Sequence, residues 1–540
     1  MTADALVPLP VVLPLFGAGL ALALGRSARA QRGVSIVVLS LVVAVAAILL
    51  VRADSHGPQV MHVGGWHAPI GISLVADRLS ALMVLVSAIV ALGVLVYSLG
   101  QGVVEYGRDT PLSVFHPTFL VLVAGVSNAF LSGDLFNLYV GFEILLAASY
   151  VLLTLGGTGA RIRAGTTYVI VSLASSIIFL SAIALTYAAT GTVNLAHLAG
   201  RFAELPGGIK LTIQLTLLTA FAIKAAVFPL SAWLPDSYPT APAPVTAVFA
   251  GLLTKVGVYA IMRTQTLLFP GSELSDLLMW AALLTMIVGI LGAVAQSDIK
   301  RMLSFTLVSH IGYMVFGVGV ASDAGLSGAI YYVVHHIVIQ TNLFLVAGMI
   351  ERRGGSTSLD RLGGLARLSP ILAIMFFIPA MNLAGIPPFS GFLGKVALMQ
   401  AGVDNGTALA YGLVIGSVVT SLLTLYAMAK AWNRAFWQGP DSQAVIDDIH
   451  HVDGLVEAPD GAARTDLHRK PVQTAERPSA RARRSIPLRW MLAGPAGGLL
   501  LVSIAMTIFA GPLFGLTERA AVDLRERTPY IDAVFEGSGP

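Results

Sequence analysis

Seven ionisable side chains interrupt long apolar segments of this 540-residue chain, and all of them can carry a proton. They are one carboxylate, three ammonium groups and three imidazoles: Glu143, Lys224, Lys255, Lys395, His310, His335 and His336. Each of these types can gain and lose a proton in a protein, whereas arginine stays protonated. A charge near a bilayer centre costs roughly 2.5–3.5 kcal/mol on insertion scales, so such residues usually serve a function. We therefore predict a proton relay, with no catalytic residue, cofactor or metal site of its own.

The use of lysine supports this interpretation. The chain has 7 lysines and 26 arginines; we assign three lysines to apolar spans and every arginine, Arg263 included, to a loop or an end segment. The alternative is that each lysine snorkels from a helix end to the interface. That alternative fits poorly at Lys224 and Lys255, which lie well inside apolar runs, and it stays open at Lys395.

Glu143 lies in the middle of the run FNLYVGFEILLAASYVLLTL, and its expected partner is Lys224. A nearby carboxylate favours the protonated lysine, so a pair that closes and opens can hold and release a proton. A static ion pair between helices is the alternative.

The three histidines lie in the runs RMLSFTLVSHIGYMVFG and AIYYVVHHIVIQTNLFLVAG. Imidazole both donates and accepts near neutral pH, which suits proton hopping, although a single buried histidine is usually only a hydrogen-bonded core residue. His335 and His336 point about 100° apart on a helix, so we expect one of them to face the interior.

Two apolar segments contain a proline near a lysine. Pro229 follows Lys224, and Pro387 and Pro388 precede Lys395. Paired interruptions in separate halves of a transporter favour repeated halves with two discontinuous helices, since irregular backbone at membrane depth must line an interior path. Kinks that serve packing alone are the alternative.

The composition predicts an all-α polytopic membrane protein. Hydrophobic residues make up 56% and charged residues 11%, against about 25% charged in soluble domains. We count about fourteen apolar spans; 22 of the 33 Lys and Arg residues then fall on one side and 8 on the other, which places both termini outside. The absence of cysteine excludes disulfides and thiolate-held zinc or iron–sulfur centres. The positive charge lies in loops, so nucleic-acid binding is not expected.

Four stretches resemble the antiporter-like subunits shared by respiratory complex I and the multisubunit Mrp Na⁺/H⁺ antiporters. They are FEILLAASYVLL, KAAVFPLSAWLPDSYPTAPAPVTAVFAGLLTKVGVYA, AQSDIKRMLSFTLVSHIGY and IPPFSGFLGK. Together the likeness covers about residues 70–430, and YYVVHHIVIQTNLFLVAG is most similar to the D-type subunits of the Mrp complexes.

The resemblance implies two inverted five-helix repeats, each with a broken helix, around a polar axis parallel to the membrane. In that family the residues matching Glu143 and Lys224 form a controlling pair, the residue matching Lys255 leads to the centre, and the residue matching Lys395 ends the axis. Gln340 departs from the pattern, because many relatives carry a lysine or histidine there and glutamine does not titrate.

On this basis we divide the chain into six segments. They are helices 1–3 (1–113), a first repeat (114–265), a second repeat (272–436), a flexible cytoplasmic loop (437–487), a last transmembrane helix (488–513) and an outer tail (514–540). The loop contains a cluster that could ligate a metal, Asp447, Asp448, His450, His451 and Asp453, but a solvated loop is the favoured interpretation.

We interpret the chain as a proton-translocating subunit of a monovalent cation (Na⁺ or K⁺)/proton antiporter in a bacterial plasma membrane, with other subunits as partners. One alternative is a proton-pumping subunit of a complex I-like NADH–quinone or hydrogenase complex, which would make it part of a translocase. The other is a scaffold subunit that moves no protons.

Overall fold

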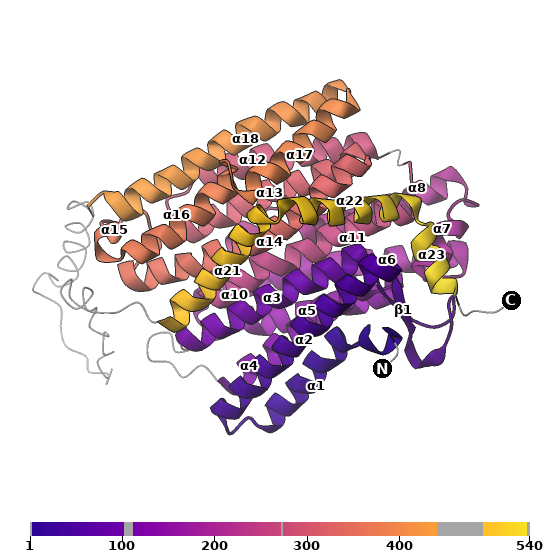
Figure 1. The fold of residues 1–540 in the computed structure, drawn as a ribbon, viewed down its shortest axis with the longest axis horizontal. Coiled ribbons are helices and arrows are strands. Elements are labelled where there is room, and N and C mark those ends of the chain that lie inside the picture. Colours follow the sequence, from indigo (N-terminus) through magenta and orange to yellow (C-terminus); the bar gives the residue numbers. More distant parts are fainter. Residues whose placement is uncertain (1–2, 102–111, 272–273, 440–489, 537–540) are drawn as a thin grey trace, which may run out of the picture.

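The computed structural model describes residues 3–101, 112–271, 274–439 and 490–536, and nearly all of them are helical. Long helices run alongside one another through the molecule (Figure 1). The strands in the described part are β1 (Gln59–His62) and β2 (Ser73–Ala76), which pair antiparallel as a short hairpin. The predicted all-α polytopic fold is confirmed apart from this hairpin.

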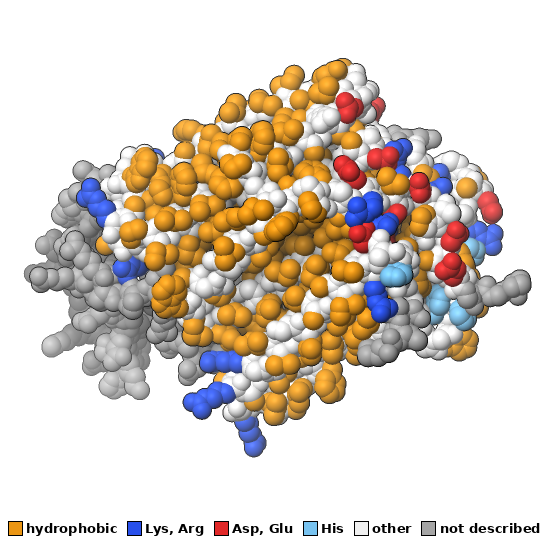
Figure 2. Space-filling model, in the orientation of Figure 1, with side chains coloured by type: hydrophobic (Ala, Val, Ile, Leu, Met, Phe, Trp, Pro, Cys, Tyr) orange, Lys and Arg blue, Asp and Glu red, His pale blue; other side chains and the backbone are white. Residues whose placement is uncertain are grey.

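Twelve of the described helices are long and apolar enough to cross a membrane, and two further apolar helices, α1 (Leu9–Ala23) and α16 (Pro370–Ala384), are shorter. Large apolar side chains such as Leu22, Ile177 and Ile415 are exposed on the outside of the bundle. The face in Figure 2 is mostly apolar along its middle, with charged side chains gathered mainly towards the ends. This is the surface of a multi-pass membrane protein; the number fourteen stays a prediction.

The N-terminal part packs against one side of the first repeat. It consists of η1 (Ala3–Leu6), α1, α2 (Ala28–His56), β1, η2 (Val63–Gly65), β2 and α3 (Arg78–Gln101). Ser27 caps α2, since its side chain accepts a hydrogen bond from the Ala30 amide at 3.3 Å.

The first group of five spans is built from α4 to α11. Its elements are α4 (Leu112–Leu131), α5 (Leu135–Thr154), α6 (Gly159–Thr190), α7 (Leu195–Arg201), α8 (Gly207–Ala225), α9 (Trp233–Ser237), η3 (Tyr238–Thr240), α10 (Ala243–Val248), η4 (Phe249–Leu253) and α11 (Thr254–Leu267). The short helix η4 is a π-helical turn, so α10, η4 and α11 form one buried rod with an irregular middle.

The second group is built from α12 to α18. Its elements are α12 (Ser275–Ala295), α13 (Ile299–Val320), α14 (Asp323–Gly354), α15 (Leu365–Leu368), α16, α17 (Ser390–Asn405), α18 (Ala408–Trp432) and the π-helical η5 (Asn433–Trp437). The apolar middle of α14 is fully buried, which places polar residues there, such as His335 and His336, away from lipid.

Each group contains a connection of the same kind, and the two connections lie at opposite ends of the bundle. Asp134 caps α5 and pairs with Asn194 in an isolated bridge, and Asp298 caps α13 and pairs with Ser358 in the same way. The first connection lies beside α7 and the second near α15, at the two ends of the long axis in Figure 1. The same local structure therefore occurs twice with opposite direction, in agreement with inverted repeats.

Each group also has a helix that stops inside the bundle. Helix α8 ends at Ala226, which has φ 59°, and α16 ends at Gly385, with φ 86°. In both, the next amide bonds back five residues: Val227 to the Ala222 carbonyl and Ile386 to the Met381 carbonyl, the pattern of a Schellman end. The predicted discontinuous helices are confirmed, but the first stops before Pro229 because the left-handed Ala226 already turns the chain.

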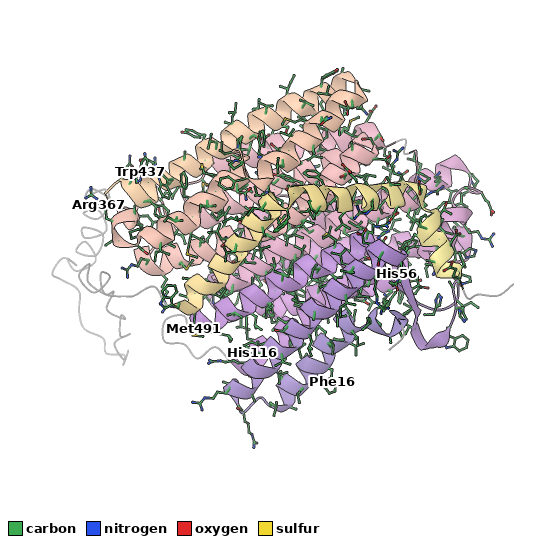
Figure 3. The ribbon with its side chains drawn as sticks, in the orientation of Figure 1. Phe16, His56, His116, Arg367, Trp437 and Met491 are labelled. Carbon is green, nitrogen blue, oxygen red and sulfur yellow. The ribbon has the colours of Figure 1, made fainter. Side chains whose placement is uncertain are left out.

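The C-terminal part comprises α21 (Trp490–Ile508), α22 (Ala510–Glu526) and α23 (Thr528–Phe535). The predicted tail from residue 514 thus begins inside α22, which packs along α14. Most of the predicted loop 437–487, including its candidate metal-binding cluster, lies outside the described residues. Figure 3 shows Arg367 and Trp437 at the α15 end of the bundle and His56 towards the α7 end.

Candidate functional site

Glu143 and Lys224 are joined through a serine. On α6, Ser176 donates a hydrogen bond to Glu143 Oε1, and Lys224 Nζ donates to Ser176 Oγ at 3.1 Å. Among the described residues no direct ion pair links Glu143 to Lys224. Three helices therefore meet at one hydroxyl: α5 supplies the carboxylate, α6 the bridge and α8 the ammonium group. The predicted partners are close, but the contact is indirect.

Lys224 lies in the last turn of α8, directly before the break. The carbonyl ends of that turn carry partial negative charge, which favours an ammonium group there. Its Nζ also lies 4.8 Å from the centre of the Phe142 ring. A side chain beyond the break also binds the end of α8, since Trp233 Nε1 donates to the Ile223 carbonyl at 3.1 Å.

A small cavity adjoins Lys224. Tyr168, Ser172, Trp233 and Tyr238 are among its lining residues, and it has room for at least one water molecule. The buried Tyr238 hydroxyl has no hydrogen-bond partner among the described residues. Polar lining and an unpaired hydroxyl are what a buried water needs, so the cavity offers a hydrated contact to the ammonium group.

Lys255, on α11, is the next lysine along the chain after Lys224. Its side chain is fully buried in α11, and Nζ donates to the Ala250 carbonyl in η4 at 2.6 Å. A π-helical turn displaces carbonyls from the regular ladder, which explains why this one can receive the ammonium group. Among the described residues no acidic side chain forms an ion pair with Lys255.

The predicted histidines form one cluster with a tyrosine. Tyr332 on α14 bonds to His310 Nδ1 on α13 at 2.7 Å, and the rings of His310 and His336 lie 5.3 Å apart between centres. His335 Nδ1 bonds to the Ser390 hydroxyl on α17 at 3.0 Å. Both histidines on α14 are fully buried, so the expectation that one of them faces the interior is wrong; the ring of His336 is the one that packs against His310.

Lys395 lies on α17 in the second half. Its Nζ donates to the carbonyls of Leu383 and Ala384 at 3.1 and 3.0 Å, at the end of the broken helix α16. It also lies 5.0 Å from the ring centre of Tyr313, and Tyr313 packs against His310. The side chain is buried, so snorkelling does not describe it.

Several buried polar atoms in the second half have no hydrogen-bond partner in the described part of the chain. Among them are both ring nitrogens of His336, Nε2 of His335 and Oε1 of Gln340. Gln340 Nε2 donates to the Leu303 carbonyl at 2.7 Å. Buried polar groups normally find a partner, so these atoms mark positions for water.

The seven predicted residues thus fall into three separate clusters. The first joins Glu143 and Lys224, the second is Lys255 alone, and the third runs from His310 to Lys395 through aromatic rings. No direct hydrogen bond between described residues connects one cluster to the next. Sequence reasoning missed Ser176, Tyr332 and Ser390; a hydroxyl in an apolar helix gives little signal, because it is common there and carries no charge.

One sequence assignment is wrong. Arg263 lies inside α11 rather than in an outer segment, and its side chain is almost fully buried. The charge is tolerated because Asp77 binds it at 2.6 Å. In the described residues no group of three or more His, Asp or Glu side chains is placed to hold a metal ion.

Comparison with known proteins decides the family. Residues 132–424 match the family described as "NADH:quinone oxidoreductase/Mrp antiporter, TM". The D-type subunit of the Na⁺/H⁺ antiporter of Alkalihalophilus pseudofirmus is 42% identical over 436 residues, which is 80% of this chain and 87% of that protein. This chain belongs to the NADH:quinone oxidoreductase/Mrp antiporter family.

Chains of two solved structures share the fold. A chain of the Mrp complex from Dietzia sp. DQ12-45-1b is 34% identical, with a TM-score of 0.86, and the match covers 99% of this chain and all of that one. A chain of respiratory complex I from Thermus thermophilus is 26% identical, with a TM-score of 0.73, over 96% of this chain and 99% of the other. The resemblance inferred from the sequence is confirmed.

Proposed function

We propose that this chain is the proton-translocating subunit of a multisubunit monovalent cation/proton antiporter. The observation that carries the proposal is the bridge of Ser176 between Glu143 and Lys224. A hydroxyl can donate to a carboxylate and accept from an ammonium group at the same time, and it can turn to exchange these roles. Such a bridge suits a proton carrier better than a static ion pair, which would need no intermediary.

The first step takes place at Lys224. A proton arrives on the lysine through water in the adjoining cavity, and the carboxylate of Glu143, acting through Ser176, stabilises the charged form. Movement of α5 or α6 that takes Ser176 away from Nζ removes this support. The buried ammonium group then gives up its proton towards Lys255 through transient water.

The later steps use groups that both donate and accept. Lys255, His310 and His336 exchange the proton through water at the unpaired ring nitrogens of His336, and Tyr332 holds one nitrogen of His310. Lys395 is the last lysine of the path. Its contacts with two free carbonyls of α16 stabilise the ammonium form until water reaches it.

Cation exchange belongs to the assembled complex in this proposal. The described part of this chain contains no cluster of carboxylates suited to Na⁺, so the metal ion would be handled together with other subunits. The excess of Lys and Arg on one side supports a chain with both termini outside the plasma membrane.

A redox-driven pump is the second candidate, favoured by the likeness to the complex I chain. Purification of the native complex decides between the two. We expect a preparation without flavin or iron–sulfur absorbance that, in liposomes, moves protons when Na⁺ or K⁺ is added and no redox substrate is present. Absorbance of either cofactor in the intact complex, with proton movement only on addition of reductant, would favour the pump.

A further inference from the structure

A row of three buried side chains leads from Lys255 towards the α7 end of the molecule. Lys255, Tyr259 and Arg263 follow one another at intervals of four residues on α11, so they share one face of the helix. All three are nearly or fully buried. The row links the middle of the proposed relay to the end predicted to lie outside.

The arginine of this row contacts one acidic side chain and two tyrosines. Arg263 pairs with Asp77 at 2.6 Å, its Nε donates to the Tyr259 hydroxyl at 3.3 Å, and Tyr259 in turn donates to the Phe130 carbonyl at 2.7 Å. The guanidinium also lies 5.0 Å from the ring centre of Tyr530. Asp77 is fixed as well, because its carboxylate accepts from the Ser80 amide at 2.8 Å.

The C-terminal helices α22 and α23, here called the C-terminal strap (510–535), cover this pair. Tyr530 on α23 is buried against it. Three ion pairs bind α22 to the neighbouring helices: Arg78 to Asp523 at 2.5 Å, Arg519 to Asp54 at 2.8 Å and Arg525 to Asp323 at 3.0 Å. The strap runs along the bundle to its α7 end (Figure 1).

The row cannot conduct protons as the lysines can. A guanidinium does not lose its proton in a protein, and protonation of Asp77 would leave that guanidinium buried without its counter-charge, which is strongly unfavourable. Beside Tyr259, a small cavity is lined by apolar side chains, among them Met83 and Met262, and apolar cavities of this kind stay dry. Fixed arginines exclude protons and cations from other membrane pores for the same electrostatic reason.

We infer that Arg263, paired with Asp77 and covered by Tyr530, is a barrier that stops protons and cations from leaking between Lys255 and the α7 end. The inference rests on the proposed function, because a leak matters only if Lys255 is part of a proton path. It assigns to the C-terminal strap the task of keeping this barrier closed.

The test measures passive proton leak, which needs no exchange activity. Inverted vesicles containing the complete complex are given a pH gradient in the absence of Na⁺ and K⁺, and its decay is followed with a pH-sensitive dye. Arg263→Gln should speed the decay several-fold. Arg525→Gln, which removes one exposed ion pair of the same strap and leaves the Arg78–Asp523 and Arg519–Asp54 pairs in place, should leave it unchanged. The double variant Arg263→Gln with Lys255→Ala should decay at the parental rate.

Unchanged decay in Arg263→Gln, or fast decay that persists when Lys255 is also replaced, would overturn the inference. Antiport that survives in Glu143→Gln counts instead against the proposed function, so the two failures are distinguishable.

A labelling experiment serves if Arg263→Gln does not assemble. Because the chain has no cysteine, Met262→Cys offers a single thiol in the dry cavity. A membrane-impermeant thiol reagent applied from outside should not label the Met262→Cys variant. It should label the double variant Met262→Cys with Tyr530→Ala, in which the side chain that covers Arg263 is removed. Equal labelling in both backgrounds would overturn the inference.

Discussion

The two halves of this molecule solve the same problem with different chemistry. Both contain a helix that stops inside the bundle next to a lysine. Lys224 lies in the last turn of α8, and Lys395 lies beside the end of α16. In the first half a carboxylate reaches the lysine through Ser176, whereas in the second half two backbone carbonyls receive it. A carboxylate can change its charge and a carbonyl cannot, so the proposed relay has its switch in the first half, at Lys224.

The surroundings of the Glu143–Lys224 site and of the second-half groups also differ. Glu143 is only partly buried and Lys224 adjoins a cavity, while His310, His335, His336 and Lys395 are buried among aromatic rings. Two charged groups joined through a hydroxyl beside water can separate at little cost, and a dry cluster changes its protonation only when water arrives. The comparison predicts control of proton transfer in the first half and conduction in the second.

The largest effect should come from loss of the switch lysine. Lys224→Ala removes the ammonium group that donates to the bridging Ser176, and we expect antiport by the assembled complex to fall roughly 100-fold, the scale of losing a proton-transfer group. Lys210→Ala in the first turn of the same helix is the matched control. Near-parental antiport in Lys224→Ala would mean that the first half has no control over transfer.

A smaller loss is expected in the second half. His310→Gln removes one titrating group, yet His336 and water remain beside it, so we expect a fall of about tenfold in antiport rate. Activity is read as the pH change in inverted vesicles on addition of Na⁺ or K⁺. A loss as deep as that of Lys224→Ala would contradict the division into a switch and a conductor.

Ser176 and its neighbour offer the closest comparison. Ser176→Ala breaks the bridge and should lower the rate several-fold, because Glu143 then reaches Lys224 only through water. Ser175→Ala removes a bond to the Ala220 carbonyl of α8 at 2.9 Å, so it should cost about 1 kcal/mol of stability and leave transport nearly unchanged. Thermal unfolding and antiport rate measured together separate the two; equal transport in both variants would remove the bridge from the mechanism.

The smallest effect is expected at Ser390, which orients His335 from α17. Because His335 does not face His310, Ser390→Ala should lower antiport by less than about threefold, on the scale of one neutral hydrogen bond. A loss as large as that of His310→Gln would bring His335 into the main path and widen the conducting half.

The site residues differ in how well they could be predicted from the sequence. Glu143, Lys224 and Lys255 stood out because a charge in an apolar run is rare and costly. Ser176 and Tyr332 did not, because neutral hydroxyls fit either lipid-facing or buried positions and only the packing of three helices gives them a role. The family resemblance supplied the inverted repeats, which hydropathy alone cannot reveal.

Boundaries and pairings were less predictable. The break after α8 falls at Ala226, before the proline that signalled it, since a left-handed alanine leaves no mark in the sequence. Arg263 was assigned to a loop or an end segment because it follows an apolar run, and its partner Asp77 lies far away in the sequence, between β2 and α3. Such long-range pairs are fixed by the fold and by no local pattern.

The most direct test of the account is the cation-induced pH change in inverted vesicles that contain the whole complex with Glu143→Gln. This variant keeps the size of the side chain and its place beside Ser176 but removes the charge that holds the proton on Lys224. The account predicts that the response to Na⁺ or K⁺ is nearly lost while the complex assembles normally. A response equal to that of the parent would contradict it.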